Sequence, residues 1–389
     1  MDKRVLFITH KYPPSIGGMQ KQSYELLTGM EKHLPVEKLV WHDRLTVPYF
    51  ILKGAGKKAR ALMQQKPIHL IHLNDGSMTM GINSLKKHAS APILSTFHGL
   101  DLIFPNPLYQ KLMIPRIKKL DKVITVSTET KTECLKRGIQ EDRIVVIPNG
   151  VDTDMSQIPR DPAFGEKLED RIGIPLQDKK ILLSVGRPVP RKGVYWFMEK
   201  VMGHLPKDAI YLVVGAPLKS DKFLRSLINF LPKRWANQLA LIYGIGLDRP
   251  EQLRLRVSER LRNRVFLLGK VPYEDLVQLY KHADLFLMPN IPVAGDMEGF
   301  GLTALEASVN GTVVVASRLE GIPDAVKDGK NGILIAPLDE AAWISKIDEL
   351  LGKTTELCKL AQKFQTYTVA HYSWDRMVSR YLELFKEYL

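Results

Sequence analysis

The sequence predicts an α/β protein with two Rossmann-like, doubly wound domains, and three observations lead to this prediction. Short apolar runs alternate with longer stretches of helical pattern, which is typical of a mostly parallel sheet covered by helices. The same alternation starts again near residue 180, after a segment dotted with prolines. The length of 389 residues suits about two domains with complete cores.

In the first half, six apolar runs are expected to form strands. They are RVLFIT, VEKLVWH, IHLIHLN, PILSTFHG, KLDKVITVS and RIVVIPNGVD. Helices are expected over residues 20–32 and over TETKTECLKRG. Because parallel strands end at one edge of a sheet, the loops that follow them are where a ligand site is expected.

The second half is expected to repeat this pattern. Its strands are ILLSVGR, IYLVVG, VFLLG and TVVVAS, with a helix from about Val194 and a final helix in YSWDRMVSRYLELFKEYL. From Gly215 to Val265 there are roughly 50 residues, about twice the length expected for one helix and its turns. An insertion is therefore expected over residues 216–264.

Composition narrows the class of protein. A hydrophobic content of 45% with 25% charged residues is ordinary for a folded globular chain. There is no apolar run of membrane-spanning length and no signal-peptide pattern, so we expect a cytoplasmic protein. Cys134 and Cys358 lack metal-ligand spacing and are expected to be reduced thiols.

The net charge of +14 favours an anionic partner. Sugar nucleotides, anionic lipid surfaces and nucleic acid would all qualify. No zinc-finger spacing or RNP-like aromatic motif accompanies the basic residues, so nucleic acid is not expected.

The stretch EGFGLTALE places Glu298 and Glu306 on either side of two glycines, in a pattern that suits a loop entering a helix. Backbone N–H groups at a helix start attract anions such as phosphate. Carboxylates accept hydrogen bonds from hydroxyls, so a sugar or ribose is their natural partner. The alternative is that Glu306 only offsets the helix dipole and Glu298 is a solvated loop residue.

Arg187 and Lys192 lie in one strand-to-helix loop, VGRPVPRKG, and two cations beside a helix start suit a diphosphate. The alternative is a solvated basic surface. His98 follows a strand in FHGLD, at the sheet edge where α/β proteins place ligands, although a lone histidine is more often structural.

Two further stretches also have ordinary structural explanations. The Gly17-Gly18 pair after the first strand is typical of a tight turn. In IPNGVD, Asn149 and Gly150 are expected to form a plain turn, since both tolerate the left-handed conformation.

Together these stretches resemble retaining glycosyltransferases of the GT-B fold, the large family four. EGFGLTALEA resembles the family's E-x7-E motif, VGRPVPRKG its G-R-x4-K-G motif and FHGLD its H-G-x-D motif. The resemblance covers nearly the whole chain. It implies two domains that face each other across a cleft: an acceptor-binding domain at 1–160, a nucleotide-sugar-binding domain at 161–372, and a C-terminal helix at 373–389 that crosses back to the first. It implies as well that Asn149, Gly150 and Asp152 of IPNGVD are linker residues.

The resemblance also assigns roles to residues. It implies that Glu298 faces the donor sugar, Glu306 the ribose, and Arg187 with Lys192 the diphosphate. His98 would contact the sugar near the reaction centre, with Asp101 orienting its loop. The remaining donor-binding candidates are backbone positions, namely Gly17, Gly18, Lys270, Val271, Gly299, Phe300, Gly301, Leu302 and Thr303.

The implied reaction is transfer of a glycosyl group from a nucleotide-diphosphate-sugar to an alcohol, with retention at the anomeric carbon. A lipid-linked or polysaccharide glycoconjugate is the acceptor class that the resemblance suggests. No metal or other cofactor is expected, because cations neutralise the leaving group and no D-x-D arrangement is evident. Two alternatives remain: another GT-B nucleotide-sugar enzyme such as an epimerase, or a non-enzymatic membrane-surface scaffold.

Two basic amphipathic helices are expected, at 108–122 and 218–242. Our hypothesis is that they dock the protein on an anionic membrane as a peripheral protein of its inner face. The alternative for 218–242 is an extra helix packed on the second domain. Two departures from the family pattern are Gly215-Ala216-Pro217 in place of a G-x-G turn and Asp324 in place of glutamate.

Overall fold

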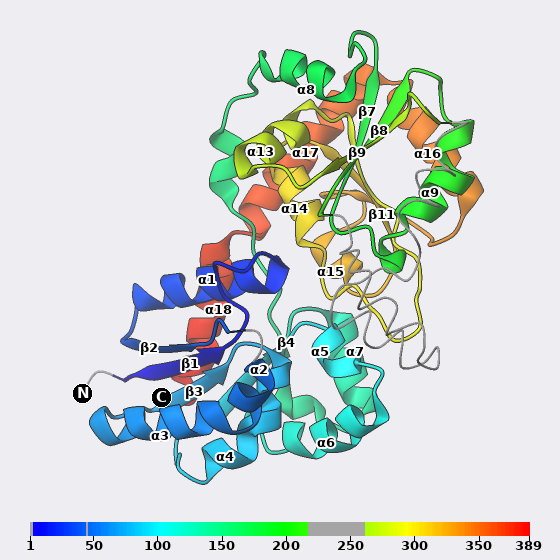
Figure 1. Ribbon diagram of the computed structural model, residues 1–389. Helices are drawn as coiled ribbons and strands as arrows, with labels where there is room; N and C mark the ends of the chain where they lie inside the picture. Colours follow the sequence, from blue (N-terminus) through cyan, green and yellow to red (C-terminus); the bar gives the residue numbers. More distant parts are fainter. Residues whose placement is uncertain (1–2, 44–45, 217–260) are drawn as a thin grey trace.

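The computed structural model describes residues 3–43, 46–216 and 261–389. Within these ranges the chain forms two six-stranded sheets, each with helices around it (Figure 1). Within the described residues, all pairs of neighbouring strands in the two sheets are parallel. The predicted fold class, α/β with two doubly wound domains, is therefore confirmed.

The first sheet has the order β2-β1-β3-β4-β5-β6. Its strands are β1 (Val5–Thr9), β2 (Val36–Val40), β3 (Leu70–Leu73), β4 (Ile93–Phe97), β5 (Lys122–Thr125) and β6 (Ile144–Val146). In β1, Val5 and Phe7 enter one core cluster and Leu6 and Ile8 enter another. Both faces of the sheet are thus buried, which is why its strands appear in the sequence as continuous apolar runs.

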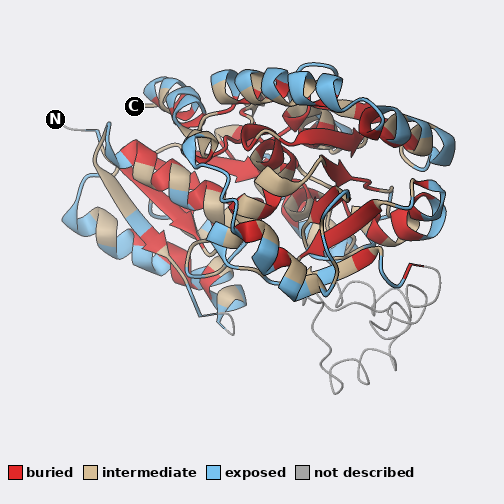
Figure 2. Ribbon diagram, turned by 90° about the horizontal axis from the view of Figure 1, so that it is seen from above, coloured by how far each residue is buried: buried red, intermediate tan, exposed pale blue. Residues whose placement is uncertain are grey.

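Helices of the first half surround this sheet. They are α1 (Gly18–Glu31), α2 (Val47–Tyr49), a π-helix (Phe50–Gly54), α3 (Ala55–Gln65), a 3₁₀ helix (Gly76–Gly81), α4 (Ile82–Lys86), α5 (Leu100–Ile103), α6 (Pro107–Ile117), α7 (Thr128–Lys136) and a 3₁₀ turn (Glu141–Arg143). Ser127 caps α7 by accepting a hydrogen bond from the backbone N–H of Thr130 at 3.2 Å. Buried strands and outward-facing exposed helix faces are visible in Figure 2.

The second sheet has the order β12-β11-β10-β7-β8-β9. Its strands are β7 (Lys180–Val185), β8 (Ala209–Val214), β9 (Val265–Gly269), β10 (Leu285–Met288), β11 (Val313–Ser317) and β12 (Ile333–Ile335). From β7 the chain continues to one side of the sheet, and from β10 to the other. Each sheet therefore has a topological switch point, between β1 and β3 in the first and between β7 and β10 in the second.

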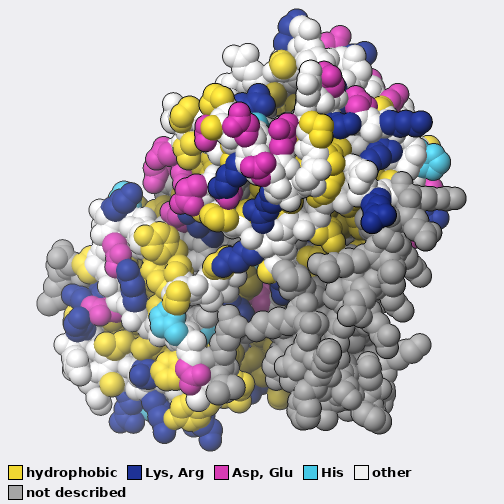
Figure 3. All heavy atoms as spheres, turned by 45° about the horizontal axis from the view of Figure 1, so that its top comes forward, with side chains coloured by type: hydrophobic (Ala, Val, Ile, Leu, Met, Phe, Trp, Pro, Cys, Tyr) yellow, Lys and Arg dark blue, Asp and Glu magenta, His cyan; other side chains and the backbone are white. Residues whose placement is uncertain are grey.

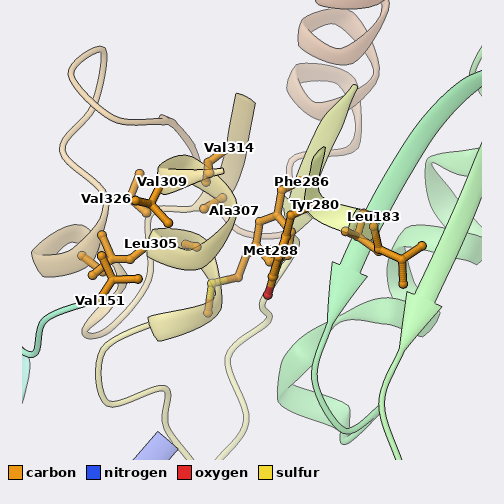
Figure 4. Packing of buried hydrophobic residues seen from close by; sticks show 14 of the residues in the cluster. Val151, Leu183, Tyr280, Phe286, Met288, Leu305, Ala307, Val309, Val314 and Val326 are labelled. Atoms are coloured by element: carbon orange, nitrogen blue, oxygen red, sulfur yellow. The ribbon is translucent and has the colours of Figure 1, made fainter. Parts of the chain in front are cut away.

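The helical elements of the second half are a 3₁₀ turn (Thr153–Gln157), α8 (Phe164–Ile172), a 3₁₀ turn (Pro190–Lys192), α9 (Val194–Lys200), a 3₁₀ turn (Met202–His204), α13 (Tyr273–His282), α14 (Leu302–Val309), α15 (Ile322–Ala325), α16 (Glu340–Leu351), α17 (Thr354–His371) and α18 (Trp374–Lys386). Figure 4 shows how α14 is fixed in place: Leu305, Ala307 and Val309 pack with Val314 of β11 and with Val326. This packing fixes the body of α14 against the second sheet.

After α17 the chain crosses from the second domain to the first, where the C-terminal helix α18 lies beside α1 (Figure 1). Its buried side chains share a core cluster with Val5 and Phe7; they are Met377, Val378, Tyr381, Leu384 and Phe385. Burying each large apolar side chain stabilises the contact by roughly 1.5–3 kcal/mol. Gly29 permits the close approach, because a Cβ there would lie 2.5 Å from Val378.

The expected left-handed turn at Asn149-Gly150 is wrong. Neither residue has a positive φ. The segment runs beside the chain that leads into α18. The N–H of Val151 donates to the carbonyl of Tyr372 at 2.6 Å, and a Cβ on Gly150 would lie 2.6 Å from the backbone nitrogen of Trp374. The left-handed turn does not form because the chain at 149–151 runs beside the segment at 372–374, and both segments connect the two sheets.

The expected helix at 108–122 is also too long. Helix α6 ends at Ile117, and Lys122 already belongs to β5. The strand prevails because Val123 and Ile124 pair with both β4 and β6 in the sheet. Leu108 and Leu112 are exposed on the same helix as exposed Lys111, so the apolar and basic residues are not on opposite faces.

The helix expected at 218–242 lies outside the described residues, as does nearly all of the 216–264 insertion. No described helix is both long enough and apolar enough to cross a membrane. On the face shown in Figure 3, the Lys and Arg side chains of the described residues are spread over both domains and do not form one continuous stripe.

Candidate active site

A charged cluster lies at the switch point of the second sheet. Lys192, in the loop after β7, places its Nζ 2.6 Å from Oε2 of Glu298, in the loop after β10. Asn290 donates to the same carboxylate oxygen at 3.2 Å. Arg191 lies 3.6 Å from Glu298 and also 3.6 Å from Asp296. The structure thus brings together two of the predicted donor-site residues, Lys192 and Glu298.

The loop after β7 can bring Lys192 to this position because of Gly193. This glycine has φ +64°, and a Cβ there would lie 1.7 Å from the carbonyl oxygen of Pro289. Any other residue would push the two loops apart. The N–H of Ile291 also donates to the carbonyl of Arg191 at 3.0 Å, which ties the loops together.

The electrostatics of this cluster keep Glu298 ionised. Burial alone would raise its pKa, but the charges of Lys192 and Arg191 and hydrogen bonds from Lys192 and Asn290 outweigh burial and lower the pKa to about 2. Burial lowers the pKa of Lys192, and the Glu298 charge opposes that shift. The cation and the carboxylate therefore depend on each other in this buried pair.

The turn from Gly299 to Thr303 leads into α14. Gly301 precedes the helix with φ +108°, a backbone conformation that favours glycine, and Phe300 is buried in the core. Leu302 and Thr303 form the first turn, whose N–H groups have no acceptor within the helix. This helix start can receive an anion.

Glu306 lies on the second turn of α14. Tyr280 of α13 donates to its Oε2 at 2.9 Å. Burial raises the pKa of Glu306, while this hydrogen bond and the charge of Lys21 oppose the shift. Lys21 comes from α1, so the first domain adds a positive charge near this glutamate.

The predicted residues of the first domain lie at its carboxyl edge. His98 donates through Nε2 to the carbonyl of Asn74 at 3.2 Å, and its backbone N–H donates to Asp101 at 2.9 Å. A Cβ on Gly299 would lie only 1.8 Å from the His98 carbonyl oxygen. The His98 loop and the Gly299 turn are therefore in direct contact across the two domains.

The Gly17-Gly18 pair also faces the second domain. Gly17 precedes α1, and a Cβ on Gly18 would lie 3.1 Å from the Leu302 side chain. The glycine loop of the first domain thus lies against the start of α14.

Lys270 and Val271 are not part of the charged cluster, and Arg187 lies at its edge. The side chain of Arg187, directly after Gly186 at the end of β7, makes no hydrogen bond or ion pair with any described residue. Burial and the charge of Arg191 lower the pKa of Arg187, while the charge of Asp296 opposes this shift. Lys270 and Val271 follow β9, where Val271 packs partly buried against the core.

The sequence analysis missed Arg191, Asn290, Asp296 and Glu320. The backbone N–H of Glu298 donates to the Glu320 carboxylate, and Glu320 itself has φ +51°. Burial raises the pKa of Glu320 to about 7, with the nearby charges of Glu298 and Asp296 adding to the rise. Arg191 had a signal in the sequence because it directly precedes Lys192, and Asn290 and Asp296 had one because they lie in the loop NIPVAGDM just before Glu298.

A second contact joins the domains. Asp324 of α15 accepts hydrogen bonds from the backbone N–H and the hydroxyl of Thr128, at 2.9 and 2.8 Å. Asp324, which stands where the family pattern has glutamate, thus holds the start of α7 against the second domain. Among the described residues, no group of three or more His, Cys, Asp or Glu side chains is arranged to hold a metal ion.

Two family models match the chain. The model described as "Glycosyl transferases group 1" matches residues 166–369, and "Glycosyltransferase Family 4" matches residues 4–155.

Relatives of known name and solved structures agree with these matches. A D-inositol 3-phosphate glycosyltransferase of Corynebacterium urealyticum is 30% identical over 68% of this chain, which spans 56% of that protein. A GDP-mannose-dependent alpha-(1-6)-phosphatidylinositol monomannoside mannosyltransferase of Mycolicibacterium smegmatis is 25% identical over 98% of this chain and 97% of its own length.

The crystal structure of Anabaena HepE in complex with UDP-glucose superposes with a TM-score of 0.73 at 19% identity, and the match covers 99% of each chain. This likeness shows the fold, which is GT-B. With the matched family models, it establishes that the chain belongs to the glycosyl transferases group 1 family.

Proposed function

We propose that the protein is a retaining glycosyltransferase that moves a sugar from a nucleotide-diphosphate-sugar to an alcohol. The observation that carries the proposal is the placing of Glu298 and Glu306 on either side of the α14 start. Glu298 is paired with a buried lysine, and Glu306 is held by Tyr280. Two fixed carboxylates flanking an anion-binding helix start match a ligand with hydroxyls at both ends and phosphate between them.

When the donor binds, its diphosphate would replace Glu298 as the partner of Lys192. In this proposal the diphosphate binds Lys192 and the exposed Arg187, and Glu298 turns its carboxylate to the hydroxyls of the sugar. The charge of these two side chains serves the leaving group, so the proposal requires no metal ion. A nucleotide-sugar donor is supported by two comparisons: the name of the Mycolicibacterium smegmatis relative includes GDP-mannose, and the HepE structure is a complex with UDP-glucose.

The chemistry proposed is a front-face substitution. The acceptor oxygen bonds to the anomeric carbon as the bond to the β-phosphate oxygen breaks, and the acceptor proton passes to the departing phosphate. His98 is proposed to contact the sugar, because its loop touches Gly299. The contacts between the domains would exclude water, which limits hydrolysis of the donor.

The first test is binding of UDP-glucose, GDP-mannose and ADP-glucose, and of the three nucleoside diphosphates, by calorimetry. Tyr280→Phe removes the hydroxyl that holds Glu306, and we expect about a threefold to tenfold loss of nucleotide affinity. Glu306→Gln should lose more, since it removes the charge that accepts the ribose hydroxyls. Arg187→Ala should lower the affinity for the nucleoside diphosphates and leave the affinity for free nucleosides unchanged.

The outcomes separate the alternatives. No binding by the folded protein would favour the scaffold, and interconversion of a nucleotide-sugar without an acceptor would favour an epimerase. For an active transferase, proton NMR of the first product must show the anomeric configuration of the donor. An inverted product, or activity abolished by EDTA and restored by Mg²⁺, would contradict the mechanism.

We also propose that the acceptor is lipid-linked and that α6 contacts the membrane that carries it. Leu108 is 65% exposed, and exposed Leu112 and Lys111 lie on the same helix. Large exposed leucines beside lysines suit a surface that inserts among anionic headgroups. The protein should bind phosphatidylglycerol vesicles more tightly than phosphatidylcholine vesicles. Leu108→Ser/Leu112→Ser should weaken this binding, and equal binding by the variant would refute the role of α6.

A further inference from the structure

The first sheet carries a histidine–aspartate pair at its own switch point, separate from the charged cluster of the second sheet. His10 follows β1 and Asp75 follows β3, and these two strands are neighbours. Nδ1 of His10 lies 3.3 Å from Oδ2 of Asp75. We propose that His10, oriented by Asp75, binds a hydroxyl of the acceptor alcohol. This inference rests on the proposed function.

Asp75 is well suited to orient the imidazole. Its side chain is fully buried, and it accepts hydrogen bonds from the hydroxyls of Thr9, at 3.2 Å, and Ser77. Burial would raise the pKa of Asp75, but His10, Ser77 and Lys11 outweigh burial and lower the pKa. The carboxylate thus stays ionised and can only accept hydrogen bonds.

The ionised Asp75 favours one tautomer of the His10 imidazole. In the tautomer that carries its proton on Nδ1, facing the carboxylate, Nε2 is an acceptor. Nδ1 is buried. Nε2 makes no hydrogen bond to any residue that the structure describes. Nε2 can therefore accept a hydrogen bond from a substrate hydroxyl.

The position of the pair places it beside the donor. Asn74, directly before Asp75, accepts the hydrogen bond from His98, whose loop touches Gly299 of the second domain. The N–H of Asn74 donates to the carbonyl of Ile8 at 3.1 Å, so the ends of β1 and β3 are held in register. His10 and His98 thus lie at one sheet edge, and α/β sheets bind ligands outside the carboxyl ends of the strands at the switch point.

A purely structural ion pair is the competing explanation, and two substitutions distinguish it. In His10→Asn, the amide nitrogen replaces Nδ1 and can still donate to Asp75, but nothing replaces Nε2. In His10→Gln, the longer amide reaches the position of Nε2. A purely structural pair requires only the contact of Nδ1 with Asp75, whereas acceptor binding also requires Nε2.

The experiment measures transfer from UDP-glucose, GDP-mannose and ADP-glucose to octyl glucoside, octyl mannoside and myo-inositol. For His10→Asn we expect about a tenfold rise in the acceptor KM, with the melting temperature and the affinity for the nucleoside diphosphate unchanged. His10→Gln should recover part of the lost affinity. An unchanged acceptor KM in His10→Asn would overturn the inference about His10 but not the proposed function. A loss of nucleoside diphosphate affinity as large as the rise in acceptor KM would do the same. No transfer by the wild type, with no nucleotide bound, would refute the proposed function itself.

Discussion

Replacing Lys192 by methionine tests the ion pair at the centre of the charged cluster. Methionine keeps most of the volume and removes the charge that lies 2.6 Å from Glu298. The side chains of Lys192 and Glu298 are only 16% and 12% exposed, so water cannot replace the lost partner well. Arg191 remains at 3.6 Å, too far for a good hydrogen bond.

The pKa of Glu298 gives the expected magnitude. It falls from the ordinary 4.5 to about 2, which corresponds to about 3 kcal/mol in favour of the folded, ionised state. Because the pKa is lowered, this contribution is present above about pH 4.5 and is lost as the pH falls towards 2. Breaking a buried pair on one side costs roughly 3–5 kcal/mol. We therefore expect Lys192→Met to lose about 3 kcal/mol of unfolding free energy at pH 7.

The loss should depend on pH. Without Lys192, burial raises the pKa of Glu298, so protonation relieves the unpaired charge and the deficit narrows between pH 7 and pH 4. Lys192→Met/Glu298→Gln should recover most of the loss, since it leaves no buried charge there. Urea unfolding can be followed by the fluorescence of Trp196 and Trp343, whose rings lie 6.1 Å apart in the second domain.

Lys200→Met is the matched control. Lys200 pairs with Glu340 at 4.0 Å on the surface, where both side chains are 48% exposed. Such pairs contribute less than about 1 kcal/mol. If Lys192→Met costs no more than Lys200→Met, or if its deficit is the same at pH 7 and pH 4, the buried pair does not have the role described.

Two further predictions concern the contact between the domains. In Gly299→Ala the new Cβ would lie 1.8 Å from the His98 carbonyl, so the domains must separate. We expect a larger radius of gyration by X-ray scattering and at least a hundredfold loss of kcat/KM, and an unchanged radius would contradict this. Asp324→Ala removes both hydrogen bonds to Thr128, each worth about 0.5–1.5 kcal/mol. Its donor KM should rise several-fold, and Thr128→Val, which removes one bond, should show a smaller rise; equal effects would refute an additive contact.

The sequence alone was sufficient for the fold and for part of the site. Strands buried on both faces must be continuous apolar runs, so β1, β4, β7 and β11 could be located from hydrophobicity. The loops that follow parallel strands reach one sheet edge, which places His98 after β4, Lys192 after β7 and Glu298 after β10 among the candidates. These inferences depend on local pattern and on the geometry of parallel sheets, both of which the sequence carries.

The tertiary structure decided the pairings. Nothing local indicates that Glu320 adopts φ +51° and receives the N–H of Glu298, or that His10 meets Asp75. Helix α6 and the Asn149-Gly150 segment departed from expectation because sheet pairing and the returning chain outweighed local preference. Contacts between residues distant in sequence depend on the packing of whole elements, and no single stretch of sequence specifies them.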